Sequence, residues 1–502
     1  MAHSTVATAG KVYLVGAGPG DPGLLTLRGA ECLRRADLVL YDYLVNPHVL
    51  VHASRDAALE CLGRHGHGRI MSQDEVNQRM ISAAQAGQTV VRLKGGDPLI
   101  FARATEECAA LTAAGVSFEI VPGITVALAA ASYAGVPLTS RDVASAVALV
   151  TGHENDDKQQ PALDYTALAT FPGTLVFYMG ITKVESWSGA LVRGGKSPQT
   201  PVAVVRRCSW PDQSTIRTTL GEVAAVIHDQ KVRPPVITIV GDVAAAEPVA
   251  EWFTERPLFR QQIMVTRPEA QADTLCARLI ELGADVIVQP AIQITPPADW
   301  APVDAALARM PDYQWLVFSS ANGVKHLLDH VLAHGDVRQL AGVNLAAIGP
   351  ATAAELARYS LRAQLVPPAY RAEELAQSLA DRVRGQRVLL ARASRGREVL
   401  AEQLRTAGAI VDQVVVYESR DIVQPDMHVR EALAAGQVGW VTVTSSAIAK
   451  SLAAMFGPDL RRARLASISP ITSQTLRELG FQVAAEARQF TTEGLIEAIL
   501  AP

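Results

Sequence analysis

The chain has 502 residues, which is too long for one hydrophobic core and predicts two to four lobes. Its net charge of −4 and its aromatic content of 5% argue against nucleic acid or an anionic membrane surface as a partner. No apolar run is long enough to span a bilayer, and residues 1–10 lack the features of a signal peptide. The five cysteines form no CxxC pair, so we expect no metal site and no disulfide framework. We therefore expect a cytoplasmic protein with a disordered lead-in at 1–10.

The first structured stretch, residues 11–23, combines a strand with a glycine-rich turn. The apolar run Val12–Val15 predicts a buried parallel strand, and Pro22 suits the first position of a following helix. Strand, glycine turn and helix together form a nucleotide-sized site at the end of a sheet. A dinucleotide-binding fingerprint is one alternative, but Asp21 stands where that fingerprint requires its third glycine.

More glycine- and proline-containing motifs follow in a fixed order, and their residues are 91–98, 121–125, 135–141, 150–153 and 175–180. In order and spacing, the whole set resembles uroporphyrinogen-III C-methyltransferase, a tetrapyrrole methylase that uses S-adenosylmethionine. The resemblance runs from about Lys11 to Val243. It implies a two-lobed α/β methylase fold, with a first lobe to about Val121, and a homodimer formed through this half.

The resemblance also implies residue roles. Asp42 matches the proton acceptor proposed for the family, although it could merely cap the following turn. Arg64 stands where the family has a lysine proposed as proton donor. Arginine is a poor proton donor because it is effectively never deprotonated, so either that role is dispensable or His65 or His67 substitutes. The positions that match the family's cofactor contacts are Pro19, Gly95, Gly96, Asp97, Ile100, Thr125, Val126, Met179 and, through its backbone, Cys208.

A substrate with eight carboxylates needs cationic partners. Arg141 is predicted to bind it, and Arg28, Lys94 and Arg103 are further candidates near the motifs. Met179 has an alternative interpretation as core filler, and any one of the cations could be a solvated surface residue.

Two prolines and mixed charges indicate a linker at 247–261, which separates a methyltransferase at 11–246 from a second half at 262–502. The second half contains an internal repeat. The stretch 316–321 recurs at 441–447, and 347–352 recurs at 467–472. This repeat predicts two similar α/β lobes, about 262–295 plus 416–502 and 296–415.

Each repeated stretch is a strand that leads into a helix through a turn rich in hydroxyl side chains or containing proline. Free N–H groups and hydroxyls at helix starts bind carboxylates, although simple N-capping explains any single case. We predict that the substrate is bound by Ser319, Ser320, Thr352, Ser445 and Thr472.

Together with stretches at 371–375, 388–392 and 414–417, the second half is similar to uroporphyrinogen-III synthase from about Ile263 to Leu500. The similarity implies that Tyr417 acts as a weak acid, although a half-buried strand tyrosine is an equal alternative. Candidate cations for the substrate carboxylates are Arg267, Arg392, Arg395 and Arg397.

Both resemblances lead to one prediction for the whole chain. The second half cyclises hydroxymethylbilane to uroporphyrinogen III, and the first half methylates that product at C-2 and C-7 with S-adenosylmethionine to give precorrin-2, for sirohaem or cobalamin. No spacing requires a metal, and no dehydrogenase fingerprint is present, so oxidation of precorrin-2 is expected elsewhere. The alternatives are a catalytically inactive, tetrapyrrole-binding second half, and a methylase acting on another corrinoid or on RNA.

Overall fold

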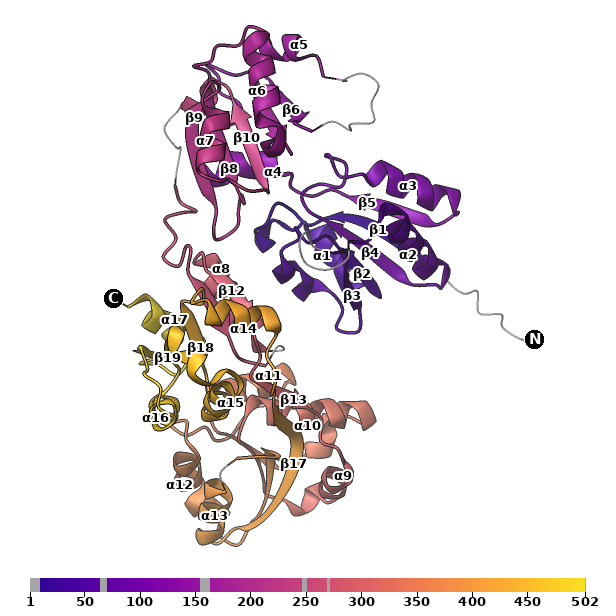
Figure 1. Cartoon of the computed structure of the whole chain (residues 1–502). Coiled ribbons are helices and arrows are strands. Elements are labelled where there is room, and N and C mark those ends of the chain that lie inside the picture. Colours follow the sequence, from indigo (N-terminus) through magenta and orange to yellow (C-terminus); the bar gives the residue numbers. More distant parts are fainter. Residues whose placement is uncertain are drawn as a thin grey trace, which may run out of the picture. The chain divides into compact units, whose positions relative to one another are not determined.

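The computed structural model describes residues 10–63, 70–153, 163–245, 251–268, 271–396 and 398–501. The chain divides into two compact units, Met1–Gln262 with Ala277–Val286, and Ile263–Cys276 with Ile287–Pro502. Both are built from five-stranded sheets with helices packed against them, which confirms the predicted α/β class (Figure 1). Within the described ranges, no helix combines the length and the apolar character needed to cross a membrane.

The first sheet has the strand order β3-β2-β4-β1-β5, and all its neighbouring strands run parallel. Its central strands β1 and β4 are buried on both faces, as a parallel sheet covered by helices requires, although β4 carries Arg92 and Lys94 among its apolar residues. The carboxyl ends of all five strands therefore lie along one edge, where ligands of such sheets bind. Its strands are β1 Lys11–Gly16, β2 Leu38–Tyr41, β3 Ala58–Cys61, β4 Thr89–Lys94 and β5 Ser117–Val121, and its helices are α1 Leu27–Arg34, α2 Gln73–Gln85 and α3 Ala104–Ala113.

The helix predicted to start at Pro22 is interrupted. Pro22–Leu24 forms a short 3-10 turn, Leu25 is extended, and α1 begins only after Thr26. The Thr26 side chain accepts a hydrogen bond from the backbone N–H of Gly29 at 3.0 Å, so a new N-cap restarts the helix. The apolar spacing alone did not reveal this break.

The second sheet has the order β6-β7-β10-β8-β9, with β6 and β7 parallel and the remaining pairs antiparallel. Helix α4 packs its alanine-rich face on this sheet, although it follows directly from the first one. The elements are α4 Val126–Tyr133, β6 Val147–Thr151, α5 Tyr165–Ala169, β7 Thr174–Tyr178, α6 Val184–Arg193, β8 Pro201–Arg206, β9 Ser214–Thr219, α7 Val223–Asp229 and β10 Val236–Val240.

The third sheet has the order β12-β11-β18-β19-β20. It joins the start of the second half to the end of the chain, because β11 pairs parallel with β18. The elements of this lobe are β11 Gln262–Val265, α8 Asp273–Glu281, β12 Asp285–Val288, α14 Met427–Ala434, β18 Trp440–Val443, α15 Ser446–Phe456, β19 Arg464–Ser467, α16 Pro470–Glu478, β20 Ala485–Glu486 and α17 Thr492–Leu500.

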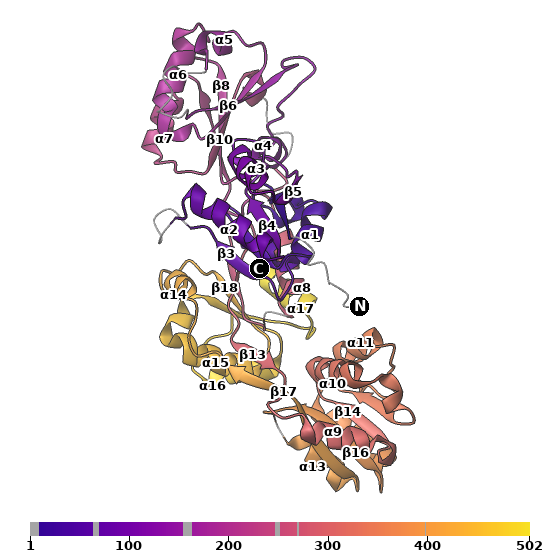
Figure 2. The same ribbon diagram turned by 90° about the vertical axis from the view of Figure 1, so that its right-hand side faces the viewer.

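The fourth sheet has the order β13-β17-β16-β14-β15 and is parallel except where β13 meets β17 (Figure 2). Helices cover both faces: Leu316 and Phe318 pack with α9 to α11, while Trp315 and Val317 pack with α12 and α13. The sheet spans Ile292 to Asp421, slightly more than the predicted lobe 296–415. Its elements are β13 Ile292–Thr295, α9 Ala301–Ala308, β14 Trp315–Phe318, α10 Ala321–His334, β15 Asn344–Ala347, α11 Pro350–Arg358, α12 Ala372–Val383, β16 Arg387–Ala393, α13 Val399–Thr406 and β17 Ile410–Asp421.

The internal repeat is visible as matching strand–helix pairs. Strand β14 leads into α10 and β18 leads into α15, with Ser320 and Ser445 as the N-caps. Strand β15 leads into α11 and β19 into α16, with Gly349 and Ser469 at the same position. The two lobes of the second half are thus built alike.

Candidate active sites in the two halves

Three glycine turns of the first half meet at the carboxyl ends of β1, β4 and β5. The N–H of Gly96 donates to the carbonyl of Gly18 at 2.7 Å, and the N–H of Gly18 donates back at 3.3 Å. A Cβ atom on Gly123 would overlap the backbone of both Gly96 and Gly16. Only glycine allows this approach, so the predicted motifs form one continuous structure.

The Asp97 side chain connects two of these turns by hydrogen bonds. Its Oδ2 accepts the N–H of Gly123 at 3.0 Å, and its Oδ1 accepts the N–H of Leu99 at 2.8 Å. Each carboxylate oxygen keeps a second lone pair. The carboxylate therefore organises the turns, and its predicted contact with the cofactor can only use the remaining lone pairs.

The backbone at Gly95 and Gly96 borders open space. An added Cβ on Gly95 would meet only the Leu44 side chain, at 3.5 Å, and one on Gly96 only the Cα of Thr125, at 4.0 Å. A ligand can approach this bare backbone closely. The turns consequently fit a nucleoside-containing cofactor such as S-adenosylmethionine.

Thr125 links these turns to the second sheet. Its hydroxyl lies 2.7 Å from the hydroxyl of Tyr178, which also accepts the N–H of Ala127 at 3.2 Å. The ring of Phe101 packs 4.9 Å from that of Tyr178. Burial raises the pKa of Tyr178, so the hydroxyl stays neutral. Val126 directly follows Thr125 and is the first residue of α4.

Met179 follows Tyr178 with a left-handed backbone, at φ 52°, and is 50% exposed. This exposure rules out the core-filler interpretation, and such strain in a non-glycine residue is typical of functional sites. Pro19 and Ile100 are half-buried. Cys208 is buried in an apolar cluster, and burial raises the pKa of its thiol to about 12, so only its backbone is available to a ligand.

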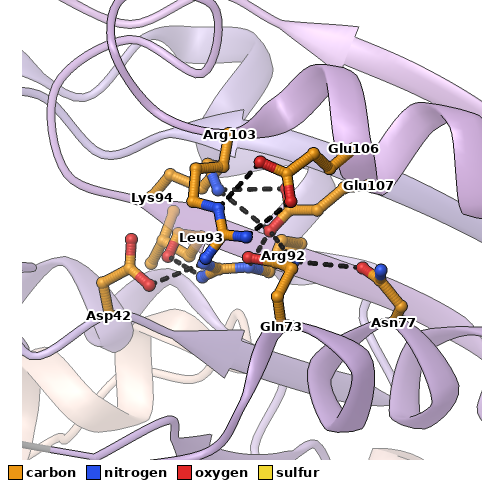
Figure 3. A network of polar contacts seen from close by, with 9 residues as sticks. All are labelled: Asp42, Gln73, Asn77, Arg92, Leu93, Lys94, Arg103, Glu106 and Glu107. Atoms are coloured by element: carbon orange, nitrogen blue, oxygen red, sulfur yellow. Dashed lines mark hydrogen bonds and ion pairs between the residues drawn. The ribbon is translucent and has the colours of Figure 1, made fainter. Parts of the chain in front are cut away.

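Asp42 follows β2 and leads to a buried ionic network (Figure 3). Arg92 Nη2 donates to Asp42 Oδ1 at 2.6 Å, and Arg92 Nε donates to Glu107 Oε1 at 3.1 Å. Lys94 Nζ binds both oxygens of Glu107, at 2.9 and 3.0 Å. Glu107 is completely buried, whereas the Asp42 side chain is 32% exposed. Asp42 is thus the accessible end of a network with two cations and two anions.

Sequence reasoning missed Glu107. A signal was present: Arg92 and Lys94 alternate with apolar residues inside a strand expected to be buried, and buried cations need a carboxylate partner. Burial lowers the pKa of Lys94, and the charge of Arg92 adds to this effect. Lys94 is therefore a structural residue and not the predicted substrate-binding cation.

The other candidate cations of this half differ in their surroundings. Arg28 pairs with Glu31 and Glu119, and Arg103 pairs with Glu106, so neither is held ready for a substrate. Arg141 is exposed and has no ion-pair partner within the described ranges. Arg64, together with His65 and His67, lies outside the described residues.

The second half contains a cavity of about 450 Å³. It brings together the segment that follows β11, the N-terminus of α15 and the strands β13, β16 and β17, which are far apart in sequence. Its polar and aromatic lining is Arg267, Gln271, Asn322, Arg395, Tyr417, Ser419, Thr444 and Ser445.

Tyr417 lines this cavity and is held from two sides. Its hydroxyl lies 3.1 Å from Ser320 Oγ, and the ring of His326 stacks at 5.7 Å. Ser320 also accepts the N–H of Gly323 at 3.1 Å, so it caps α10 as well. The cavity therefore combines a positioned phenol with the N-termini of α10 and α15.

Arg267 is the cation best suited to a ligand in this cavity. Nη1 donates to Thr492 Oγ1 at 3.1 Å, and among the described residues no carboxylate lies within ion-pair distance. Burial lowers the pKa of Arg267, although a guanidinium remains charged at neutral pH. Arg395 also lines the cavity but pairs with Asp421 at 2.8 Å. Arg392 pairs with Glu398, outside the cavity.

The predicted hydroxyl residues do not all reach this cavity. Ser445 lines it, and Ser320 borders it through Tyr417, while Ser319 is half-buried and does not line it. Thr352 and Thr472 are 3% and 2% exposed, inside the first turns of α11 and α16, and neither lines the cavity. The structure thus does not support these two as substrate-binding residues. Each residue lies on the buried face of its helix, and the Thr472 hydroxyl lies 3.1 Å from that of the N-cap residue Ser469. Arg397 lies outside the described residues.

Comparison with known proteins identifies both halves. Residues 11–224 match the model of the family Tetrapyrrole (Corrin/Porphyrin) Methylases, and residues 273–497 match that of Uroporphyrinogen-III synthase HemD. The two resemblances predicted from the sequence are therefore confirmed.

Individual relatives agree with this division. The Porphyrin biosynthesis protein HemD of Ruminiclostridium josui is 30% identical, over 98% of each chain. The Uroporphyrinogen-III C-methyltransferase of Bacillus subtilis is 41% identical over 56% of this chain, which spans 58% of that relative's length.

Among solved structures, a Uroporphyrin-III C-methyl transferase of Thermus thermophilus complexed with S-adenyl homocysteine is 39% identical. It covers 47% of this chain and 99% of its own, with a TM-score of 0.41. From the two family matches and the relative aligned over its whole length, the chain belongs to the family of the porphyrin biosynthesis protein HemD and joins a tetrapyrrole methylase to a uroporphyrinogen-III synthase.

Proposed function

We propose that the second half cyclises hydroxymethylbilane to uroporphyrinogen III and that the first half converts this product to precorrin-2 by methylation at C-2 and C-7. The placement of Asp42 is the observation that carries the methylation. A partly exposed carboxylate lies at the same sheet edge as the glycine turns, with a buried arginine behind it.

When bound, S-adenosylmethionine supplies an electrophilic methyl group. The residues proposed to hold it are Gly95, Gly96 and Asp97 on one side and Thr125 and Met179 on the other. A pyrrole carbon of the substrate forms a bond to the methyl carbon while the carbon–sulfur bond breaks, which leaves positive charge on the macrocycle. Asp42 stabilises this charge and accepts the proton that the ring loses. Arg92 holds Asp42 in place for both steps.

In the second half, Tyr417 donates a proton to the departing hydroxyl of hydroxymethylbilane, which leaves as water. The resulting azafulvene is attacked by the substituted carbon of the last pyrrole. The spiro intermediate fragments and recloses with that ring inverted, and the proton that the macrocycle then loses returns to Tyr417. The cavity supports this role because Ser320 orients the phenol and Arg267 offers a charge for a substrate carboxylate. Binding in the cavity would shield part of the azafulvene from water.

One assay tests both activities. The purified chain is mixed with hydroxymethylbilane, with or without S-adenosylmethionine, and the products are separated by chromatography. We expect uroporphyrinogen III without S-adenosylmethionine and precorrin-2 with it. Asp42→Asn should lower the methylation rate by about 10²- to 10⁴-fold and leave cyclisation unchanged. Tyr417→Phe should slow cyclisation only.

Other outcomes separate the rival functions. Formation of uroporphyrinogen I alone would mean spontaneous closure, and the second half would then be a tetrapyrrole-binding module. Methylation of another corrinoid or of RNA, but not of supplied uroporphyrinogen III, would reassign the first half. We further propose a homodimer through the first half and a cytoplasmic location. Sedimentation of the full chain tests the dimer, and the mass of a single chain would contradict it.

A further inference from the structure

The segment that follows the methylase half, residues 251–260, is anchored on the C-terminal end of α4. We call it the connecting segment. Phe253 is 2% exposed and packs its ring 4.7 Å from that of Tyr133. The Trp252 ring lies 5.0 Å from the same tyrosine, and its Nε1 donates to the carbonyl of Ser132 at 3.0 Å. The rings of Trp252 and Phe253 thus both pack on Tyr133, the last residue of α4.

The connecting segment also stabilises its own conformation. The guanidinium of Arg256 lies 4.7 Å from the ring centroids of both Trp252 and Phe253, a cation–π arrangement. The ring of Phe259 packs 5.7 Å from that of Phe253. Because of these contacts, the segment packs as part of the methylase half and is not only a spacer between the two halves.

Tyr133 connects this anchor to the first glycine turn. Its hydroxyl donates to Asp21 Oδ2 at 2.9 Å. Asp21 Oδ1 accepts the N–H of Gly23 at 2.8 Å, so the same carboxylate shapes the turn two residues after Pro19. Burial and the neighbouring Asp21 both raise the pKa of Tyr133, which keeps its hydroxyl protonated as the donor.

A second connection reaches the same aspartate. The N–H of Asp21 donates to Ser209 Oγ at 3.1 Å, and the N–H of Ser209 donates to Gln213 Oε1 at 2.8 Å. Gln213 Nε2 donates to the carbonyl of Tyr133 at 2.8 Å. The connecting segment touches this loop as well, because the N–H of Arg260 donates to the carbonyl of Pro211 at 3.1 Å. Asp21 is therefore held by two elements that the segment contacts.

We propose that Tyr133 and Trp252 are positioning residues for S-adenosylmethionine: the connecting segment, through Tyr133 and Asp21, holds the Pro19 turn in the shape that binds the cofactor. This inference rests on the proposed function of the first half. The matched methylase region ends at residue 224, so Trp252 and Phe253 lie beyond it. The connecting segment thus supports the Pro19 turn from outside the matched region, as part of the methylase half.

The test measures binding of S-adenosylhomocysteine to the full-length chain by titration calorimetry. Tyr133→Phe removes only the hydroxyl that binds Asp21, and Trp252→Ala removes one of the two rings that pack on Tyr133 together with the hydrogen bond to Ser132. We expect each change to raise the Kd at least about threefold, with a raised KM for S-adenosylmethionine and a nearly unchanged kcat. Because both residues act through the same series of contacts, the double variant should have nearly the same Kd for S-adenosylhomocysteine as either single variant.

Controls separate positioning from loss of folding. Trp252→Phe keeps a ring against Tyr133 and should restore the Kd. Trp300→Ala removes a tryptophan that stacks on His330 at 3.9 Å in the second half, and it should leave the Kd unchanged. Circular dichroism and thermal unfolding of each full-length variant report whether its first half is folded.

Two results would overturn the inference. If folded Tyr133→Phe and Trp252→Ala chains bind S-adenosylhomocysteine like the unmodified chain, the connecting segment does not position the turn, while the proposed methyltransferase stands. If the unmodified chain does not bind S-adenosylhomocysteine at all, the proposed methyltransferase falls together with this inference.

Discussion

Arg92 donates through Nη2 to Asp42 Oδ1 at 2.6 Å and through Nε to Glu107 Oε1 at 3.1 Å. One residue thereby joins the accessible carboxylate of the methylase half to a carboxylate without any solvent exposure. A bidentate planar cation is suited to this bridge, and a lysine is not. The geometry explains how a carboxylate at the end of β2 keeps a fixed direction.

Glu107→Gln should destabilise the first half strongly. The change leaves the buried charges of Arg92 and Lys94 with too little compensation, and breaking such a buried network costs about 3–5 kcal/mol. Glu106→Gln is the matched control, because the adjacent Glu106 pairs with Arg103 at the surface and should contribute about 0–1 kcal/mol. Chemical denaturation measures both variants. Equal effects of the two substitutions would contradict a buried network.

Gly123→Ala should destabilise the junction of the glycine turns. The new Cβ would overlap backbone atoms of Gly16 and Gly96, which cannot move aside as a side chain can. We expect a loss of about 1–3 kcal/mol and weaker binding of S-adenosylhomocysteine. Gly189→Ala in α6 is the control, because its Cβ would meet only the flexible Arg193 side chain, at 3.1 Å. A Gly123→Ala chain as stable as this control would show that the turns are farther apart in solution.

Arg267→Gln should weaken the synthase reaction at the level of substrate binding. The variant loses the charge that faces the cavity, so we expect the KM for hydroxymethylbilane to rise about tenfold or more, equivalent to about 1.4 kcal/mol. Steady-state cyclisation rates measure this effect. Arg392→Gln removes an arginine that is paired with Glu398 and should change the KM little. If Arg392→Gln raised the KM more than Arg267→Gln does, Arg392 would be the residue that binds the substrate carboxylate.

His326 should make the second half less stable in acid. Burial lowers the pKa of His326 below its usual 6.5, with the charge of Lys325 adding to the effect. The unfolded chain therefore binds the proton first, and the free energy of unfolding falls as the pH drops through about 6.5 towards the folded-state pKa. Above that range the residue has no such effect.

The measurement compares thermal unfolding at pH 7.5 and 5.5 for the unmodified chain and for His326→Gln. Between pH 7.5 and 5.5, the unfolding temperature of His326→Gln should fall less than that of the unmodified chain. His228→Gln, at a side chain that is 86% exposed, should behave like the unmodified chain. An unchanged pH dependence in His326→Gln would assign the acid sensitivity to other groups.

The sequence by itself determined the class of the fold and the order of its parts. Apolar runs such as Val12–Val15 are long enough to specify strands, and glycine turns at 16–20 and 95–96 leave few conformations, so these motifs could be recognised without coordinates. The repeat of 316–321 at 441–447 likewise predicted the matching strand–helix pairs. Local patterns suffice here because neighbouring residues decide local structure.

Only the tertiary structure decided which polar side chains share a site. Glu107 lies 15 residues from Arg92, and Tyr133 lies 112 residues from Asp21, yet each pair is hydrogen-bonded. Thr352 and Thr472 looked like binding residues because their motifs repeat, but they face the interior. Partners across such separations are chosen by the packing of whole layers, and the direction of a side chain depends on that packing rather than on its own motif.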